Sequence, residues 1–412
     1  MKKIPIERSV GLLEARRVLE GTLQAYGIEW EIEVTGQYIF TAKCTLYDAH
    51  GELIDYGYGK GSREESEIGA MFESAEHWFS RFSNSQTENV QYQNSHAYIS
   101  STSLTINLPL SIISDTLAGN IALRSYVQIG GSTKVLYPVA LCTPKYVDDI
   151  LTNPLKYPLD SFDYSKIDRY CTNSGVAIGS NELEATIHGL LEAIERHSLS
   201  KFLVRVFLAM DSSALRVIDK KTLPSALQRK VQCVEKEVGH SILIIELENE
   251  FKVPVFCSVL SGSRFLIEVA GYGCSLSREH ALYRSIHEVA QCYHASAVFY
   301  REQFHDKANN IISNLSHSEA HLRCAKFKIK EQCQKLGSLE VSFLNTPDYN
   351  VPELLNTYLE CLTKKIENTG CRAFSSILNT LWGGQVITHS FIETQDHFFC
   401  VTEGCFVFPN QI

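Results

Sequence analysis

Acidic residues recur at helical spacing in residues 182–201. A helix advances by about 100° per residue, so side chains separated by four, eight and eleven positions share one side of it. The side chains that share a side here are Glu184, His188, Glu192 and Glu195. Three glutamates with no lysine between them repel one another, which suits a solvated face. The alternative is a cation site, because carboxylate oxygens suit magnesium, particularly when phosphates complete its coordination.

Two other stretches repeat this pattern. Residues 59–82 pass from glycines into a helix on which Glu73 and Glu76 lie three residues apart, with another glutamate eight residues before Glu73, as in the first helix. Residues 271–299 pass from glycines into a helix again and place Glu288 at the corresponding point. We therefore expect three quasi-repeated strand–loop–helix units whose glutamates converge on one cleft that binds metal ions.

The residues around these glutamates resemble the motifs of the YcaO family of ATP-dependent amide-activating enzymes. The resemblance spans roughly residues 55–300 and rests on five segments read together: GKG at 59–61, ESAEHW at 73–78, TNSGVAIG at 172–179, EATIHGLLEAIERHS at 184–198 and ALYRSIHEVAQ at 281–291. It implies that ATP is held through magnesium ions by glutamates on helices. The sequence has no GxxxxGKS motif, so this nucleotide site differs from a Walker site.

The resemblance also implies roles for individual residues. It implies metal ligands at Glu73, Glu76, Glu184, Glu192 and Glu195. It implies nucleotide contacts at Lys60, Asn173, Ser174, His188, Arg196 and Arg284, and it makes Glu195 and Arg196 the catalytic pair. For three of these residues an ordinary structural role stays open. Lys60 suits a solvated loop, Arg196 an ion pair with a neighbouring glutamate, and His188 a buried position in a helix.

Two positions depart from the family pattern. His77 and Tyr293 stand where many members have arginine. Arg284 is then a candidate for the missing phosphate contact. An alternative is a member that has kept the fold as a binding or scaffold subunit and lost catalysis.

The reaction we expect is cyclodehydration of Cys, Ser or Thr to azolines in a ribosomally made precursor peptide. The side chain attacks the preceding carbonyl, and phosphoryl transfer to the resulting oxyanion makes that oxygen a good leaving group. The enzyme then contributes positioning and charge stabilisation, and it needs no nucleophile of its own. Peptide thioamidation and macroamidine formation share the ATP-dependent step, so the glutamates do not distinguish the three outcomes.

Charge and composition narrow the partners and the compartment. The formal net charge is −9, which disfavours a nucleic-acid partner. No apolar run is long enough to span a membrane, and no apolar segment follows the N-terminal lysines as in a signal peptide. Thirteen cysteines without a CxxC pair predict a reduced, cytoplasmic chain. The resemblance implies a homodimer or a hetero-complex, with a separate leader-binding protein and, in some systems, a flavin dehydrogenase.

We expect an α+β fold with one large mixed domain over residues 1–412. Its N-terminal part (1–105) carries the GKG motif and the first glutamate helix, its central part (106–300) binds ATP, and its C-terminal part is 301–412. Helices are expected at 9–26, 64–82, from 182 onward, and at 225–238, 278–300, 318–336 and 352–368. Loops are expected at 84–104 and 143–170, and strands at 240–247, 253–260 and 265–270.

Overall fold

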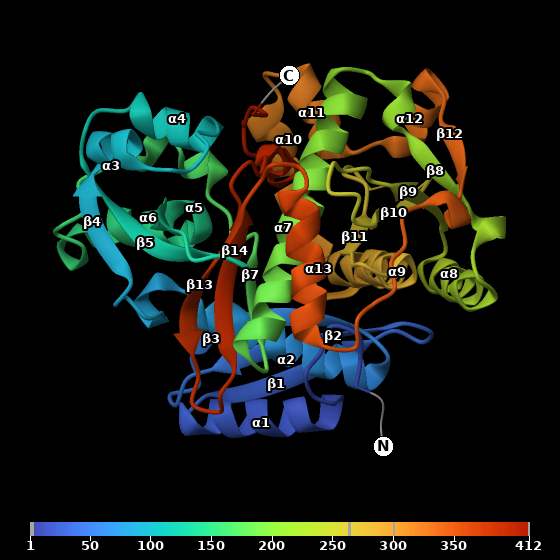
Figure 1. The fold of residues 1–412 in the computed structure, drawn as a ribbon. Helices are drawn as coiled ribbons and strands as arrows, with labels where there is room; N and C mark the ends of the chain where they lie inside the picture. The colour runs from blue at the N-terminus through green and yellow to red at the C-terminus, as the bar shows by residue number, and fades with distance from the viewer. Residues whose placement is uncertain (1–3, 263–264, 300, 411–412) are drawn as a thin grey trace.

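A long buried helix, α7 (Glu182–Leu203), runs through the middle of the molecule (Figure 1). The computed structural model describes residues 4–262, 265–299 and 301–410. Among the residues described, which form three β-sheets, α7 packs between the sheet that contains β7 and β14 and the sheet that contains β11. It is buried on nearly every side because apolar or small residues surround its polar ones. Asn181 caps its first turn by accepting a hydrogen bond from the Glu184 backbone N–H.

The N-terminal sheet is a three-stranded antiparallel meander covered by α2. The helix begins in a capping box. Ser62 Oγ accepts from the Glu65 N–H, and the Glu65 carboxylate accepts from the Ser62 N–H. The elements of this unit are α1 (Leu12–Ala25), β1 (Glu29–Thr35), β2 (Phe40–Tyr47), β3 (Leu53–Gly61) and α2 (Arg63–Phe79).

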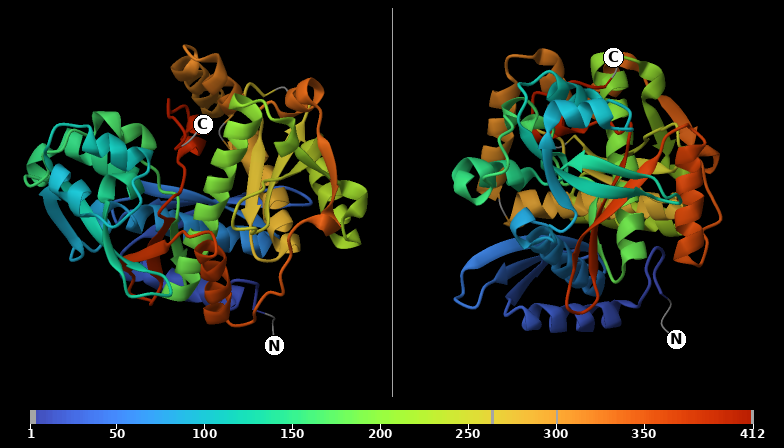
Figure 2. Two further views of the ribbon diagram at one scale, coloured as in Figure 1. Left: turned by 45° about the horizontal axis from the view of Figure 1, so that its top comes forward. Right: turned by 60° about the vertical axis from the view of Figure 1, so that its left-hand side comes forward.

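The second sheet joins distant parts of the chain in the order β4-β5-β13-β14-β7, with β6 paired to β5. The C-terminal hairpin β13–β14 thus lies between strands from the first half of the chain. It reaches α1, where Thr22 Oγ1 donates to Gln385 Oε1 at 2.9 Å (Figure 2, right). The strands are β4 (Val90–Asn94), β5 (Asn120–Gln128), β6 (Lys134–Pro138), β7 (Val176–Gly179), β13 (Ala373–Thr380) and β14 (Val386–Ile392). Four helices gather at its outer end: α3 (Ser95–Ser101), α4 (Leu108–Ser114), α5 (Val139–Cys142) and α6 (Pro144–Thr152).

The third sheet has the order β11-β10-β9-β8-β12, and only the β8–β12 pair is parallel. Apolar residues alternate along β9, so Ile242 and Ile244 pack toward α8 and α9 while Ile245 packs into the cluster around α7. The strands are β8 (Arg216–Asp219), β9 (Ser241–Glu246), β10 (Val255–Ser261), β11 (Ala270–Cys274) and β12 (Leu339–Ser342). The remaining helices are α8 (Ser225–Val238), α9 (Arg278–His294), α10 (Arg301–Leu315), α11 (Glu319–Lys326), α12 (Ile329–Leu336) and α13 (Leu355–Glu367).

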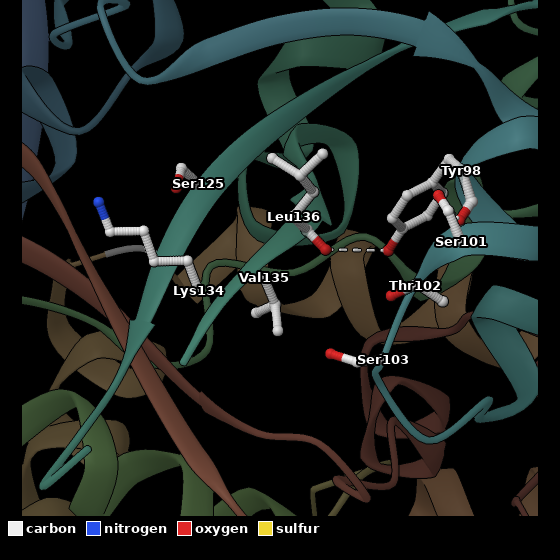
Figure 3. A pocket seen from close by; sticks show the side chains of 8 residues that line it. All are labelled: Tyr98, Ser101, Thr102, Ser103, Ser125, Lys134, Val135 and Leu136. Carbon is white, nitrogen blue, oxygen red and sulfur yellow. Dashed lines mark hydrogen bonds between the residues drawn. The ribbon is translucent and has the colours of Figure 1, made fainter. Parts of the chain in front are cut away.

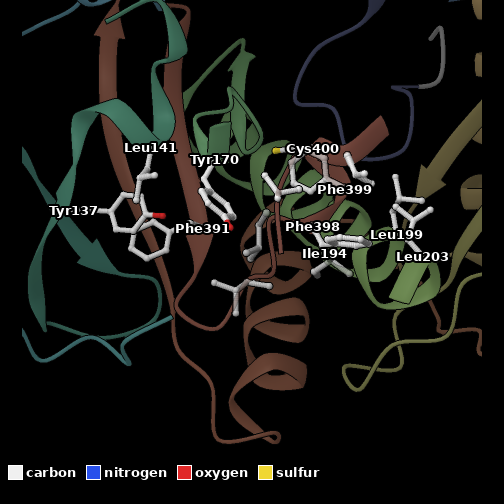
Figure 4. Close-up of a cluster of buried hydrophobic side chains, with 14 of the residues drawn as sticks. Tyr137, Leu141, Tyr170, Ile194, Leu199, Leu203, Phe391, Phe398, Phe399 and Cys400 are labelled. Carbon is white, nitrogen blue, oxygen red and sulfur yellow. The ribbon is translucent and has the colours of Figure 1, made fainter. Parts of the chain in front are cut away.

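The largest apolar cluster surrounds α7 and ties its flanking sheets together (Figure 4). Ile194, Leu199 and Leu203 of α7 are almost fully buried, and they pack in the same cluster as Phe391 of β14 and Phe398 of the short helix η10 (Phe398–Glu403). Among the described residues, no helix is long and apolar enough to cross a membrane.

The predicted α+β class with one mixed domain is confirmed, and the helix predicted at 225–238 matches α8. The loop predicted at 84–104 is wrong, because this segment contains β4 and α3. Residues 143–170 contain α6, and the strand predicted at 265–270 instead occupies 270–274. The single helix predicted at 318–336 is two helices, because Phe327 adopts a left-handed conformation with φ of 52° between them. The quasi-repeat of the three strand–helix units stays a prediction.

Three strands meet the helix that follows them by direct backbone contact at glycine. A Cβ atom would lie 1.9 Å from Ser66 O at Gly59, 2.5 Å from Ala185 N at Gly179, and 2.1 Å from Val289 N at Gly271. The strand–helix pairs are β3 with α2, β7 with α7, and β11 with α9. Glycine is required at these contacts because any side chain would push the helix away from its strand.

We predict that Gly271→Ala lowers the free energy of unfolding by about 3 kcal/mol, because the added methyl group overlaps the backbone of α9. Gly21→Ala is the matched control. A Cβ atom at Gly21 meets nothing within 4 Å, and alanine in this helix interior raises stability by up to about 1 kcal/mol. Urea unfolding measures both variants. Equal stability of Gly271→Ala and the wild type would contradict the packing at this contact.

Candidate functional site

Five glutamates from three helices lie close enough to influence one another's ionisation. We call them the glutamate cluster: Glu73 and Glu76 of α2, Glu192 and Glu195 of α7, and Glu288 of α9. Glu76 also covers the free edge of β7, because its Oε2 accepts from the Ile178 N–H at 2.8 Å. The glycine contacts described above place the three helices so that these carboxylates face a common region.

Burial and mutual repulsion raise most of the pKa values in the glutamate cluster. Burial raises the pKa of Glu195 to about 7, and the charge of Glu288 adds to the effect. Burial and the charge of Glu192 raise the pKa of Glu76 well above its ordinary value, and burial raises the pKa values of Glu73 and Glu192. Four carboxyl groups are therefore held where a nearby cation would favour their ionised forms.

Two basic residues neutralise part of this charge. Lys60 Nζ pairs with Glu288 Oε2, and this pairing outweighs burial and lowers the pKa of Glu288. Lys60 lies in β3 and not in a solvated loop. Arg196 Nε lies 3.6 Å from Glu192 Oε1, so the ion pair considered from sequence is present. The Arg196 guanidinium also lies over the rings of Tyr272 and Phe399, at 5.9 and 5.7 Å from their centroids.

The turn at residues 172–175 borders the glutamate cluster. The Gly175 N–H donates to Glu192 Oε2 at 3.4 Å. Ser174 is buried, and its Oγ has no hydrogen-bond partner among the described residues. Asn173 is exposed, and its carbonyl accepts from the Val176 N–H. A buried hydroxyl without a partner is costly, and because Ser174 adjoins the Gly175 N–H that contacts Glu192, a ligand bound at the glutamate cluster would satisfy it.

Glu184 and His188 contact the N-terminal segment in this structure. The Glu184 carboxylate accepts from Arg8 Nη1 at 3.0 Å, from the Ser9 N–H at 3.0 Å and from Ser9 Oγ at 2.7 Å. His188 Nδ1 lies 3.3 Å from Arg8 Nη1, and its buried Nε2 has no partner among the described residues. Burial lowers the pKa of His188 well below its ordinary value, so the ring is neutral. The metal role of Glu184 stays a prediction.

A second buried carboxylate, Glu7, fastens the same segment. It accepts from Ser275 Oγ and Tyr358 OH, each at 2.6 Å, and Arg284 Nη1 lies 3.4 Å from it. Arg284 thus contacts the N-terminal segment, and its predicted phosphate contact stays a prediction. Sequence reasoning missed Glu7, Arg8 and Ser9, because their partners lie far away in the chain and no local spacing signals such pairings.

The residues of the glutamate cluster fit magnesium only as part of a larger coordination shell. Among the described residues, no group of three or more His, Cys, Asp or Glu side chains is arranged to hold a metal ion by itself. Magnesium commonly takes one or two carboxylates and completes its shell with water and substrate phosphates. The raised pKa values and the partnerless Ser174 hydroxyl fit such a shared site.

Two cavities lie away from the glutamate cluster. One of about 240 Å³ lies between α3 and β6, where Tyr98 OH donates to the Leu136 carbonyl at 3.1 Å (Figure 3). The other, of about 320 Å³, lies beside α13 and is lined by Lys364 and Lys365. None of the glutamates in the cluster lines either cavity.

The comparisons with known proteins agree with this geometry. The profile of the family described as YcaO cyclodehydratase, ATP- and Mg²⁺-binding, matches residues 57–374. The chain therefore belongs to the YcaO family, and the prediction of ATP and magnesium as cofactors is confirmed by the family description. A comparison with curated protein sequences finds no significant match.

Solved structures of similar fold include three relevant proteins. YcaO from Methanopyrus kandleri bound with AMPPCP and Mg²⁺ aligns with a TM-score of 0.64 and 17% identity, over 96% of this chain and 94% of that chain. A heterocyclase in complex with substrate and cofactor aligns with a TM-score of 0.64 and 12% identity, over 95% of this chain and 54% of that chain. This chain thus spans about half the length of that heterocyclase. The E. coli microcin synthetase McbBCD complex with pro-MccB17 bound aligns with a TM-score of 0.53 and 14% identity, over 90% and 88%. At these identities the likeness concerns the fold.

We predict that Glu195 makes the free energy of unfolding of the metal-free protein depend on pH. Its pKa in the folded state is about 7, above the ordinary value of 4.5. Between these values the folded state binds more protons than the unfolded state, so this residue lowers the free energy of unfolding as pH rises. Relative to the wild type, Glu195→Gln gains up to about 3 kcal/mol at pH 8 and little at pH 4.5. Glu319→Gln, at an 88% exposed side chain, is the control. Parallel stability curves for Glu195→Gln and the wild type would refute this assignment.

Proposed function

We propose that this chain uses ATP and magnesium to activate peptide backbone amides, and that it forms azolines from Cys, Ser or Thr in a ribosomally made precursor peptide. The observation that carries the proposal is the convergence of glutamates from α2, α7 and α9 in a chain of the YcaO family. Partly buried carboxylates that repel one another suit divalent cations and the phosphates they accompany.

In this proposal the described residues divide the work of binding. Glu73, Glu76, Glu192 and Glu195 hold magnesium together with phosphate oxygens, and Glu184 belongs to the same set. Lys60 and Arg196 face the phosphates, while Ser174, Asn173 and His188 bind other parts of the nucleotide. ATP supplies the phosphoryl group that turns the amide oxygen into a leaving group.

We assign two catalytic roles on α7. The Arg196 guanidinium is permanently charged and is fixed by Glu192 and two aromatic rings, so it suits stabilisation of negative charge on the transferring group. Glu195 is buried beside Glu288, which raises its pKa to about 7 in the metal-free protein. A bound cation would favour its ionised form, and an ionised carboxylate at this position can take a proton from the attacking hydroxyl or thiol of the peptide.

The thiols near the glutamate cluster support a mechanism without a protein nucleophile. Burial raises the pKa of Cys292 to about 12 and raises those of Cys257 and Cys274 well above the ordinary value. All three are protonated at neutral pH, and the thiolate is the nucleophilic form. Charge stabilisation of phosphoryl transfer needs no such group.

The proposed partners follow from the proposed reaction. The substrate is a precursor peptide, and we propose that a separate protein binds its leader, within a hetero-complex or beside a homodimer. The microcin synthetase of similar fold is a complex with its pro-peptide bound. A flavin dehydrogenase would oxidise azolines to azoles. All thirteen cysteines are free, which suits a reducing compartment such as the cytoplasm.

We predict that MgATP binding depends on the glutamate cluster. Glu192→Gln and Glu195→Gln each remove a charge that holds magnesium, and each should weaken binding by at least about ten-fold. Isothermal titration calorimetry measures this, with Glu319→Gln as the control that keeps wild-type affinity. Unchanged affinity in both cluster variants would place the nucleotide elsewhere.

We predict that treating the precursor peptide with enzyme, partners and MgATP removes one water, about 18 Da, for each modified Cys, Ser or Thr. Tandem mass spectrometry must locate each loss on such a residue, because macroamidine closure also removes one water. A gain of about 16 Da would instead identify thioamidation, in which sulfur replaces oxygen. No mass change, despite nucleotide binding and active partners, would favour the scaffold alternative.

A further inference from the structure

A buried imidazole lies directly behind the turn that borders the glutamate cluster. His389 of β14 is 2% exposed, and its Nε2 lies 3.1 Å from the Ser174 carbonyl oxygen. Its Nδ1 lies 2.8 Å from the Tyr126 hydroxyl of β5. The ring is stacked on Phe391 and is nearly perpendicular to Tyr126, with interplanar angles of 21° and 82°. The imidazole therefore has little freedom to rotate.

The hydrogen-bond partners fix the tautomer of this histidine. The Ser174 carbonyl can only accept, so Nε2 must carry the proton. Burial lowers the pKa of His389 to about 3, so the ring is neutral and Nδ1 has a free lone pair. Nδ1 therefore accepts the hydroxyl proton of Tyr126. The result is a directed relay from Tyr126 through His389 to the Ser174 carbonyl.

Other contacts hold the turn on either side of the Ser174 carbonyl. The Ser174 N–H donates to Thr172 Oγ1 at 3.1 Å. The Ser390 N–H donates to the Gly175 carbonyl at 2.8 Å, which fastens the end of the turn to β14. On the opposite side α7 touches the turn, and a Cβ atom at Gly189 would lie 2.3 Å from Gly175 O. The peptide plane between Ser174 and Gly175 carries the Ser174 carbonyl at one end and the Gly175 N–H, which faces Glu192, at the other.

We propose that His389 and Tyr126 are positioning residues: they hold the Ser174–Gly175 peptide so that the Ser174 hydroxyl faces the bound nucleotide while the Gly175 N–H stays on Glu192. The inference rests on the proposed function for its ligand. Neither residue needs to touch the nucleotide, because both act through the Ser174 carbonyl. Both come from strands far in sequence from the turn that they orient.

The first test measures MgATP affinity by calorimetry in Tyr126→Phe. Without the hydroxyl, His389 Nδ1 loses its partner, and the imidazole keeps only one of the two hydrogen bonds that fix its position behind the Ser174 carbonyl. We expect about ten-fold weaker binding, which corresponds to the loss of roughly one well-placed hydrogen bond. Thr388→Val is the matched control. Thr388 neighbours His389 in β14, is fully buried, and its Oγ1 has no partner among the described residues. The affinity of the Thr388→Val variant for MgATP should therefore equal that of the wild type.

A double-mutant cycle separates positioning from general core packing. If Tyr126 acts through the Ser174 hydroxyl, Tyr126→Phe should weaken binding much less in a Ser174→Ala background than in the wild type. Additive losses in the double variant would overturn the inference. So would a Tyr126→Phe variant that is less heat-stable but binds MgATP as tightly as the wild type.

A nucleotide-free measurement keeps this inference distinguishable from the proposed function. Hydrogen–deuterium exchange followed by mass spectrometry should show about ten-fold faster exchange in residues 172–176 of Tyr126→Phe, as expected when one stabilising hydrogen bond is lost. Exchange in β10 reports global opening and should not change, and Thr388→Val should leave both segments unchanged. If the wild type binds no MgATP, the proposed function fails, but the exchange measurement still tests whether Tyr126 and His389 hold the turn. Unchanged exchange at 172–176 would overturn the inference in either case.

Discussion

Electrostatic repulsion among partly buried carboxylates is the constraint on which this structure depends. The fold holds the glutamates of three helices against one another, although burial and like charge both oppose their ionisation. Lys60 and Arg196 offset part of this repulsion. The remaining repulsion must be offset by favourable packing elsewhere, and the apolar cluster around α7 provides that packing. The glutamate cluster thus destabilises the fold when no cation is bound and is stabilised by bound cations, and it lies within an otherwise well-packed core.

The helices can carry this strain because they cannot move independently of their strands. Direct backbone contact at Gly59, Gly179 and Gly271 leaves no side-chain layer that could adjust. Close-packed contacts of this kind transmit strain and do not absorb it. The positions of the glutamates are therefore set by the strand–helix contacts more than by the flexible side chains themselves.

The predictable part of this site was local in sequence. Glu192 and Glu195 lie on one helix, so spacing alone placed them together, and the motifs around them identified the family. Helix α8 was predictable for the same reason, because its apolar residues recur with helical period. Pairings across the chain gave no such signal. The hydrogen bond from Arg8 to Glu184 joins residues 176 positions apart, and the contact between Tyr126 and His389 joins residues 263 positions apart. The helix break at Phe327 was also missed, because phenylalanine rarely adopts the left-handed backbone conformation and the neighbouring residues carry no sequence signal for it.

The position of the β13–β14 hairpin has a consequence for the order in which the molecule is assembled. During synthesis α2, α7 and α9 emerge first, yet β7, on which α7 packs, pairs on the second sheet with β14. That sheet stays open between β5 and β7 until residues 373–392 have left the ribosome. Contacts between residues so far apart in sequence form late, because the entropic cost of closing the long loop between them comes before any stabilisation from the contacts. The β13–β14 hairpin therefore forms its contacts last, so the turn at 172–175 is supported by β14 only after nearly the whole chain has been synthesised. A product truncated before the hairpin contains the glutamates but lacks the strands that orient them.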